Sequence, residues 1–153
     1  MKNNDILRRL RYALNLSDAA VVEIFTYSHH AITLVDVAEL LLKEEEPGYR
    51  PCNDVLMAKF LNGLIVFKRG PGGDGQVRPP EKSLTNNDIL KKLRVALNLK
   101  EEDMLEVFRA ADHEISKSEL TALFRKDGHK HFTPCGDQLL RNFLKGLAVR
   151  LRA

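Results

Sequence analysis

Apolar residues recur along the chain at the spacing of one face of a helix, in eight short segments. In the first of them, Ile6, Leu7, Leu10 and Leu14 fall at i, i+1, i+4 and i+8. This pattern predicts helices over about 4–14, 18–27, 87–97 and 101–111, and further helices opening at Thr33, Asp54, Ser116 and Asp137. The alternation that is typical of strands is weak everywhere. The expected fold class is therefore all-α.

Polar residues at the expected helix ends support these boundaries. Thr33 with Asp36, and Ser116 with Glu119, have the spacing of a capping box at a helix start. For the first helix we expect Asn3 or Asn4 to act as N-cap. At the far ends of the two matching helices stand asparagines, a residue that tolerates the left-handed conformation of a helix stop; they are Asn15 and Asn98.

The chain repeats itself at an offset of 83 residues, as from Asn3 to Asn86. Aligning 3–67 with 86–150 gives about 26 identities in 65 positions, which indicates a tandem duplication. We expect a helical repeat at 1–67, a Gly/Pro linker at 68–82 and a second helical repeat at 83–153. A unit of this size buries only about 60% of its unfolded surface and is marginally stable alone. The two four-helix repeats should therefore pack on each other as a pseudo-two-fold helical domain.

Composition adds few constraints on function. The net charge is +3 with a pI near 8.9, a bias too small to indicate nucleic-acid binding by itself. Two cysteines, one in each repeat, do not suit a secreted disulfide scaffold. The sequence shows neither an apolar leader nor a span of about 18 apolar residues, so we expect a cytoplasmic protein without a membrane segment.

Matched polar residues on the first helix of each repeat are the leading candidates for binding. Asn4, Arg8, Arg11 and Asn15 lie at i, i+4, i+7 and i+11, on one helix face. The candidate binding residues are Arg8, Arg11, Asn15, Lys91, Arg94 and Asn98. Arginine is kept at 11 and 94, as expected where a planar guanidinium has a bidentate partner. That partner is either an external anion or an internal carboxylate such as Asp54.

A second matched set combines residue types that bind zinc. It consists of His30, Cys52 and Asp54 in the first repeat and His113, Cys135 and Asp137 in the second. The spacing of known zinc sites is absent, and each repeat supplies only three candidate ligands. The alternative is a small buried cysteine beside a helix start. We expect no metal and no cofactor.

Two other features bear on packing and on partners. Gly63 and Gly146 lie inside the expected fourth helices, where glycine is costly, so we expect another helix to approach their backbone closely. The charge also reverses between the repeats at equivalent positions. Glu44–Glu46 is acidic, whereas Arg125–His131 is basic. These runs either meet across the pseudo-two-fold or mark a surface for an asymmetric partner.

The strings N-N-D-I-L-K-K-L-R, F-L-N-G-L and C-G-D-Q-L-L-R-N-F-L-K-G-L-A resemble the YehS-like bacterial family. That family has chains of about this length, built from two copies of a domain of unknown function. The resemblance covers both repeats and implies a bacterial cytosolic protein with a duplicated helical domain. It implies no catalytic residue, cofactor or substrate.

Together these features favour a binding module without catalytic activity, in which two repeats present a composite groove to a protein or peptide partner. The alternative is a nucleic-acid-binding protein that uses a basic patch on the first helix of each repeat. Those patches would consist of Arg8, Arg9 and Arg11, and of Lys91, Lys92 and Arg94.

Overall fold

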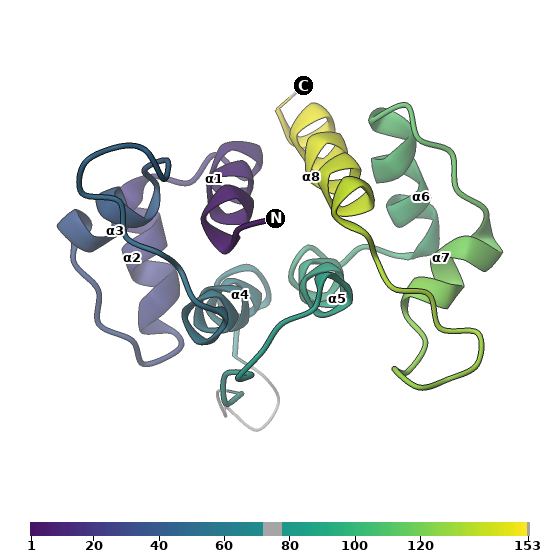
Figure 1. The fold of residues 1–153 in the computed structure, drawn as a ribbon, viewed down its shortest axis with the longest axis horizontal. Coiled ribbons are helices and arrows are strands. Elements are labelled where there is room, and N and C mark those ends of the chain that lie inside the picture. Colours follow the sequence, from purple (N-terminus) through teal and green to yellow (C-terminus); the bar gives the residue numbers. More distant parts are fainter. Residues whose placement is uncertain (72–77, 153) are drawn as a thin grey trace.

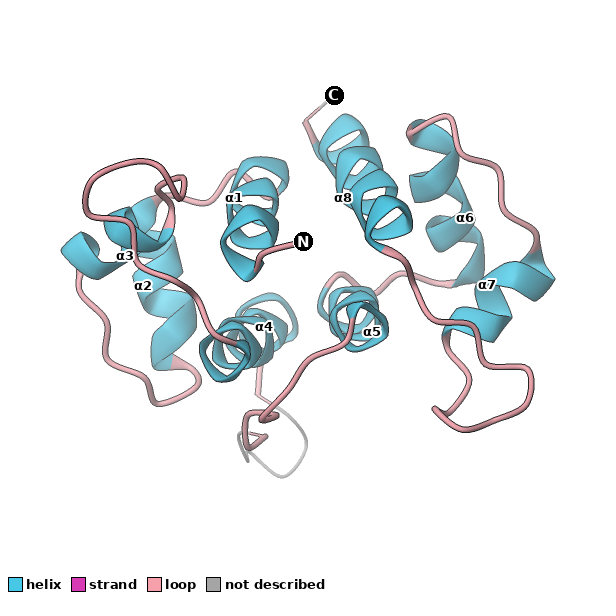
Figure 2. Ribbon diagram, viewed as in Figure 1, coloured by secondary structure: helices cyan, strands magenta, loops and turns pink. Residues whose placement is uncertain are grey.

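The computed structural model describes residues 1–71 and 78–152, and these residues form eight helices without a strand (Figure 2). The helices are α1 (Asn3–Ala13), α2 (Asp18–Thr26), α3 (Leu34–Leu40), α4 (Asp54–Arg69), α5 (Asn86–Ala96), α6 (Glu101–Ala110), α7 (Lys117–Leu123) and α8 (Asp137–Leu151). The all-α prediction is confirmed, with four helices in each repeat.

The helices form two halves that meet along four central helices (Figure 1). At the meeting plane, α1 of the first repeat packs on α8 of the second, and α4 packs on α5. Outside this layer, α2 packs on α4 and α3 at one end, and α6 packs on α8 and α7 at the other. We call the contact of α1 with α8 and the contact of α4 with α5 the two seams. Exchanging the repeats turns the α1–α8 seam into the α5–α4 seam. The expected pseudo-two-fold packing is therefore present.

The hydrogen bonds at the beginning of each seam obey this symmetry. Asp54 Oδ2 accepts from the backbone nitrogen of Leu84 at 3.0 Å, and Asp137 Oδ2 accepts from the nitrogen of Met1 at 2.6 Å. Leu84 is the residue that the repeat offset places on Met1. The first residue of each fourth helix therefore holds the chain that enters the other repeat's first helix.

The far ends of the seams are also matched. Arg69 Nη1 donates to the carbonyl of Val95 at 3.3 Å, and Arg152 Nη1 donates to the carbonyl of Tyr12 at 3.0 Å. Start lies beside start and end beside end, so the two helices of each seam run parallel. Hydrogen bonds between the repeats thus fix both ends of both seams.

One hydrophobic core runs through both repeats. Its largest side chains are four fully buried phenylalanines, which pair within each repeat. The rings of Phe25 and Phe60 lie 5.7 Å apart between centroids, and those of Phe108 and Phe143 lie 5.5 Å apart, both tilted. These pairs join α2 to α4 and α6 to α8, so each outer helix pair is anchored on a seam helix.

The close backbone approach expected at the helical glycines is confirmed. A Cβ on Gly63 would lie 2.1 Å from the carbonyl oxygen of Ile24 in α2, and a Cβ on Gly146 would lie 1.8 Å from that of Val107 in α6. Glycine is required at both positions because any side chain would collide with the neighbouring helix backbone.

Most helix ends lie as the sequence predicts. The capping boxes at Thr33 and Ser116 are present, and Asn15 and Asn98 both have φ of 52°, as expected for helix stops. The N-cap prediction for α1 is wrong. The helix begins at Asn3 after Lys2, and both asparagines lie inside it.

The expected linker differs from the structure at its start. Lys68 and Arg69 belong to α4, because cationic side chains in a last turn are favoured by the helix dipole. Residues 72–77 of the linker lie outside the described residues. Among the helices described, none combines the length and apolar character needed to cross a membrane.

Replacing Gly63 with alanine should destabilise the protein by about 2 kcal/mol or more, since α2 must move away from α4. Urea unfolding followed by circular dichroism measures this change. Gly136→Ala is the control, because a Cβ there meets no atom within 4 Å and only the weaker N-cap preference of alanine, about 1 kcal/mol or less, is lost. Equal losses in the two variants would contradict the close approach.

Candidate functional site

The matched asparagines at the start of α1 and α5 serve the interior of the protein. Asn4 is buried, and its amide nitrogen donates to the carbonyls of Leu40 and Arg50 at 2.9 and 2.8 Å. Its oxygen accepts from the backbone nitrogen of Cys52 at 3.0 Å. Asn87 makes the three equivalent bonds in the second repeat. These side chains hold the loop before the fourth helix onto the first helix.

The neighbouring asparagines explain the matched Cys-x-Asp sequence. Asn3 Nδ2 donates to the carbonyl of Cys52 at 3.0 Å and to Asp54 Oδ1 at 2.8 Å. Asn86 does the same with Cys135 and Asp137, at the same two distances. Each aspartate is therefore occupied by an asparagine on one oxygen and by the other repeat's entering chain on the second. Its duplication has a structural cause.

The candidate metal and thiol set does not come together as a site. Burial raises the pKa of the Cys52 thiol to about 12 and that of Cys135 to about 11, with a smaller contribution from the adjacent aspartate, so both are neutral at physiological pH. His30 packs on the ring of Phe25 and lies 3.3 Å from Lys59 Nζ. Partial burial and that ammonium lower its pKa.

His113 packs on Phe108 in the same way as His30 packs on Phe25. Over residues 1–71 and 78–152, no three histidine, cysteine or carboxylate side chains lie close enough to hold a metal ion. Each buried thiol therefore acts as a small apolar residue.

The matched arginines have internal partners, but not the one expected. Arg11 pairs with Asp18 at 3.0 Å, and its Nε donates to the carbonyl of Leu16 at 3.2 Å. Of the two alternatives, the structure shows the internal carboxylate, but it is Asp18 and not Asp54, whose oxygens accept from Asn3 and Leu84. Arginine suits this position because its planar guanidinium can bind a carboxylate and a backbone carbonyl at the same time. Arg11 thus fastens the turn between α1 and α2.

Arg94 has a related but different role. Its Nε donates to the carbonyl of Leu99 at 3.1 Å, as in the first repeat. Its guanidinium lies over the ring of Phe124, 4.7 Å from the centroid, where the first repeat has Leu41. Asn98 is the left-handed residue that ends this turn.

Three of the six candidate binding residues line one surface, which we call the α1–α8 groove. Arg8, Arg11 and Asn15 line a cavity of about 370 Å³ together with Tyr12, Leu16, Leu41 and Arg152. A neighbouring cavity of about 300 Å³ is lined by Arg8, Arg9, Tyr12, Leu144, Lys145 and Ala148. The two cavities share Arg8 and Tyr12. Both repeats contribute to this groove, whereas Lys91 lies in a separate cavity of the second repeat.

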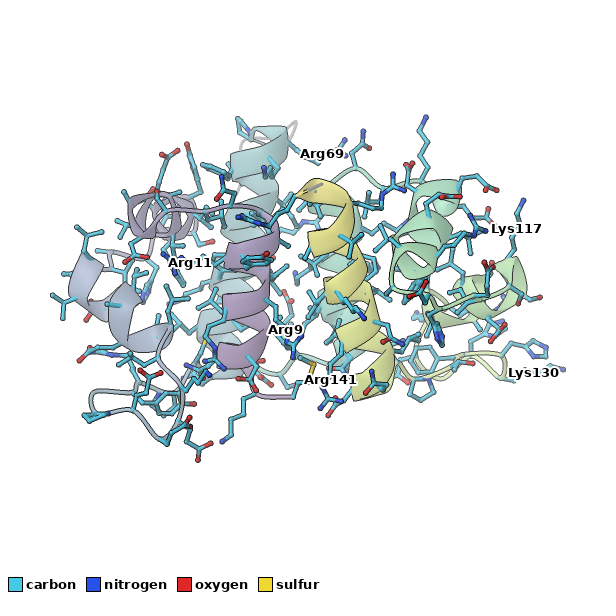
Figure 3. The ribbon with its side chains drawn as sticks, turned by 90° about the horizontal axis from the view of Figure 1, so that it is seen from above. Arg9, Arg11, Arg69, Lys117, Lys130 and Arg141 are labelled. Atoms are coloured by element: carbon cyan, nitrogen blue, oxygen red, sulfur yellow. The ribbon has the colours of Figure 1, made fainter. Side chains whose placement is uncertain are left out.

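The α1–α8 groove is cationic. Arg9 and Lys145 are exposed, and neither forms an ion pair with a described residue. Figure 3 shows Arg9 on α1 and Arg141 on α8 on the same face of the molecule, beside the line where the two helices meet. Tyr12 is 60% exposed, and the Arg152 guanidinium stacks on its ring at 4.2 Å. Cationic side chains of both helices therefore line this seam.

The pseudo-equivalent α4–α5 seam has the opposite character. Lys92 takes the place of Arg9, and Asn62 takes the place of Lys145. Lys92 Nζ lies 2.6 Å from Asn62 Oδ1 and 2.8 Å from a carboxylate oxygen of Glu81, which belongs to the segment before α5. The Lys92 side chain is only 11% exposed. Part of the linker covers and neutralises this seam.

Lys145 of α8 was not among the predicted binding residues, because those candidates were polar residues shared by both repeats. In the groove, Lys145 replaces Asn62 of the first repeat. The useful signal was the difference in charge between the two copies.

The described geometry is that of a duplicated helical domain with four helices in each repeat, and the comparison with known families agrees. The chain belongs to the family described as "Protein of unknown function (DUF1456)", whose model matches it twice, at 3–70 and 86–153.

Among curated proteins, the chain is similar to the "Uncharacterized protein YehS" of Escherichia coli (strain K12). The two are 42% identical over 150 residues, which cover 98% of this chain and 96% of that protein. No solved structure matches the chain. The resemblance to a family of tandem domains is therefore confirmed over both repeats.

Both thiols should react slowly in the folded protein. With pKa values of about 12 and about 11 against 9.0 for a free thiol, thiolate at pH 8 is scarcer by about two to three orders of magnitude. Iodoacetamide labelling followed by mass spectrometry measures the rate. The same reaction in urea is the control and should be faster by at least about 100-fold. Comparable rates in both conditions would contradict the burial of the thiols.

Proposed function

We propose that the protein is a binding module without catalytic activity, and that its α1–α8 groove takes an acidic segment of a protein partner. The groove is composite, since α1 comes from the first repeat and α8 from the second. A cytoplasmic location fits two reduced, buried cysteines. The absence of catalysis fits thiols held in the protonated form and aspartates engaged in hydrogen bonds.

The observation that carries this proposal is the contrast between the two seams. At the α4–α5 seam the chain itself supplies Glu81, which neutralises the cation on the seam helix. At the α1–α8 seam the corresponding Arg9 lines the same cavity as Lys145, and no described carboxylate pairs with either of them. Two like charges on adjacent helices repel each other, so an external carboxylate would relieve the repulsion. The covered seam thus supports an occupant that carries a carboxylate.

The shape and lining of the groove favour a polypeptide. Its lining contains the apolar side chains of Leu144 and Ala148 and the exposed ring of Tyr12. The same lining contains the cationic side chains of Arg9 and Lys145. A segment that carries acidic residues beside an apolar one can use both features, since apolar burial supplies affinity and charge supplies specificity. A bare phosphate backbone would use only the cations.

Reversing the two unpaired charges should abolish much of the binding. A labelled oligoglutamate peptide serves as probe, and fluorescence anisotropy measures its Kd. Arg9→Glu with Lys145→Glu should raise the Kd by about tenfold or more, since each rim charge contributes roughly 1 kcal/mol. Circular dichroism should show an unchanged helix content, because both residues are exposed.

Lys117→Glu with Lys130→Glu is the matched control, because it changes the net charge equally at the outer end of the second repeat, away from the central groove (Figure 3). It should leave the Kd within about twofold of the wild-type value. Equal losses in the two double variants would mean that only net charge matters and would overturn the proposal. A single-stranded oligonucleotide of the same charge separates the nucleic-acid alternative. Tighter binding of that oligonucleotide, falling steeply with salt, would replace the peptide partner.

A further inference from the structure

A second cavity lies at the outer side of the second repeat, away from the α1–α8 groove. It has a volume of about 950 Å³ and lies between the start of α5, the end of α7 and the loop that follows α7. Its cationic lining residues are Lys91, Arg125 and Lys126, and its apolar ones include Leu84, Phe124 and Phe132. We call it the second-repeat cavity.

The same place in the first repeat is nearly closed. The cavity there measures about 230 Å³, and its lining includes Lys2, Arg8, Glu44 and Tyr49. Lys2 Nζ pairs with Glu44 at 2.7 Å and draws the loop onto the helix start. The Tyr49 hydroxyl donates to Asn4 Oδ1 at 3.0 Å. The two contacts hold the loop after α3 against α1.

The second repeat lacks the groups that make these contacts. Thr85 replaces Lys2, so Asp127, at the position of Glu44, has no ammonium to pair with there. Phe132 replaces Tyr49 and has no hydroxyl. The framework asparagine is retained as Asn87, with its bonds to the backbone intact. The cavity therefore opens by loss of closing side chains on an unchanged scaffold.

Two further replacements release positive charge into the opened space. In the first repeat, Arg8 Nη1 donates to the carbonyl of Leu42 at 2.9 Å, and the guanidinium also pairs with Asp5. Lys91 stands at the position of Arg8 and makes no hydrogen bond or ion pair with a described residue. Arg125 replaces Leu42 itself, so an apolar side chain becomes a cation.

Two carboxylates, those of Asp88 and Asp127, also line the cavity, so its three cations leave a net charge of +1. Asp88 Oδ2 accepts from the backbone nitrogen of Thr85 at 2.9 Å, in the capping box of α5. The burial that raises the pKa of Cys135 keeps that thiol neutral. The Arg94 guanidinium lies over the ring of Phe124. The lining thus combines a net positive charge with aromatic side chains.

We propose that the second-repeat cavity binds a small molecule with a flat apolar body and one anionic group. The anionic group would lie against Lys91 and its cationic neighbours, and the body against Phe124 and Phe132. This site is distinct from the α1–α8 groove. It does not depend on the function proposed for that groove.

Two fluorescent dyes of the same ring system test the proposal. Anilinonaphthalene sulfonate carries an anionic group, and N-phenyl-1-naphthylamine is its uncharged relative. We expect the sulfonate dye to bind one site per chain and to bind at least about fivefold more tightly than the neutral dye, a preference of about 1 kcal/mol. Fluorescence titration gives both the stoichiometry and the Kd.

The first repeat supplies the template for a variant that closes the site. Thr85→Lys, Asp127→Glu and Phe132→Tyr together restore the groups of the ion pair and of the tyrosine hydrogen bond. This triple variant should lose the dye site, whereas Arg9→Glu with Lys145→Glu should keep it. Lys91→Ala should remove the preference for the sulfonate dye and keep the folded state, since Lys91 forms no hydrogen bond or ion pair with a described residue.

Two results would overturn the proposal. One is an unchanged dye site in the folded triple variant, and the other is equal affinity of the wild-type protein for the two dyes. If the triple variant does not fold, Lys91→Ala alone carries the test, and a retained preference for the sulfonate dye would then count against the site.

Discussion

Everything in this structure depends on the exchange of helix partners between the two repeats. The first helix of each repeat packs along the fourth helix of the other, so neither repeat can complete its core by itself. A unit of four short helices buries too small a fraction of its surface to be stable alone. The matched hydrogen bonds from Asp54, Asp137, Arg69 and Arg152 fix the ends of both seams. Duplication thus supplies within one chain what a homodimer would supply between two.

This packing also determines which positions can differ between the two repeats and which cannot. The glycines beneath α2 and α6, and the asparagines that hold the loops, are the same in both copies because they meet backbone atoms. Side chains that face solvent at the seam or in the cavity have no such constraint. Asn62 and Lys145 occupy equivalent places with different charge, as do Leu42 and Arg125. The candidate binding surfaces lie where the copies differ.

Helix positions could be predicted from the sequence, because apolar spacing, capping boxes and helix-stop asparagines are local signals. Gly63 and Gly146 also revealed a close helix contact, because only a steric reason explains glycine inside a helix. The partner of Arg11 could not be predicted, since Asp18 competes with every other carboxylate and only the turn between α1 and α2 selects it. The buried Asn4 was mistaken for a cap, because its four partners come from residues 40–52. The α1–α8 groove could not be predicted, because the sequence does not tell which helices pack on each other.

The parallel course of α4 and α5 sets a condition on the segment that connects them. The end of α4 lies beside the end of α5, yet the chain must enter α5 at its start. The two ends that the connection joins are therefore about one length of α4 apart, and the 16 residues of α4 span about 24 Å. About seven or eight extended residues are the minimum for that distance. A chain with a shorter tether could satisfy both seams only by exchanging halves with another molecule, which would convert the single-chain fold into an intertwined pair.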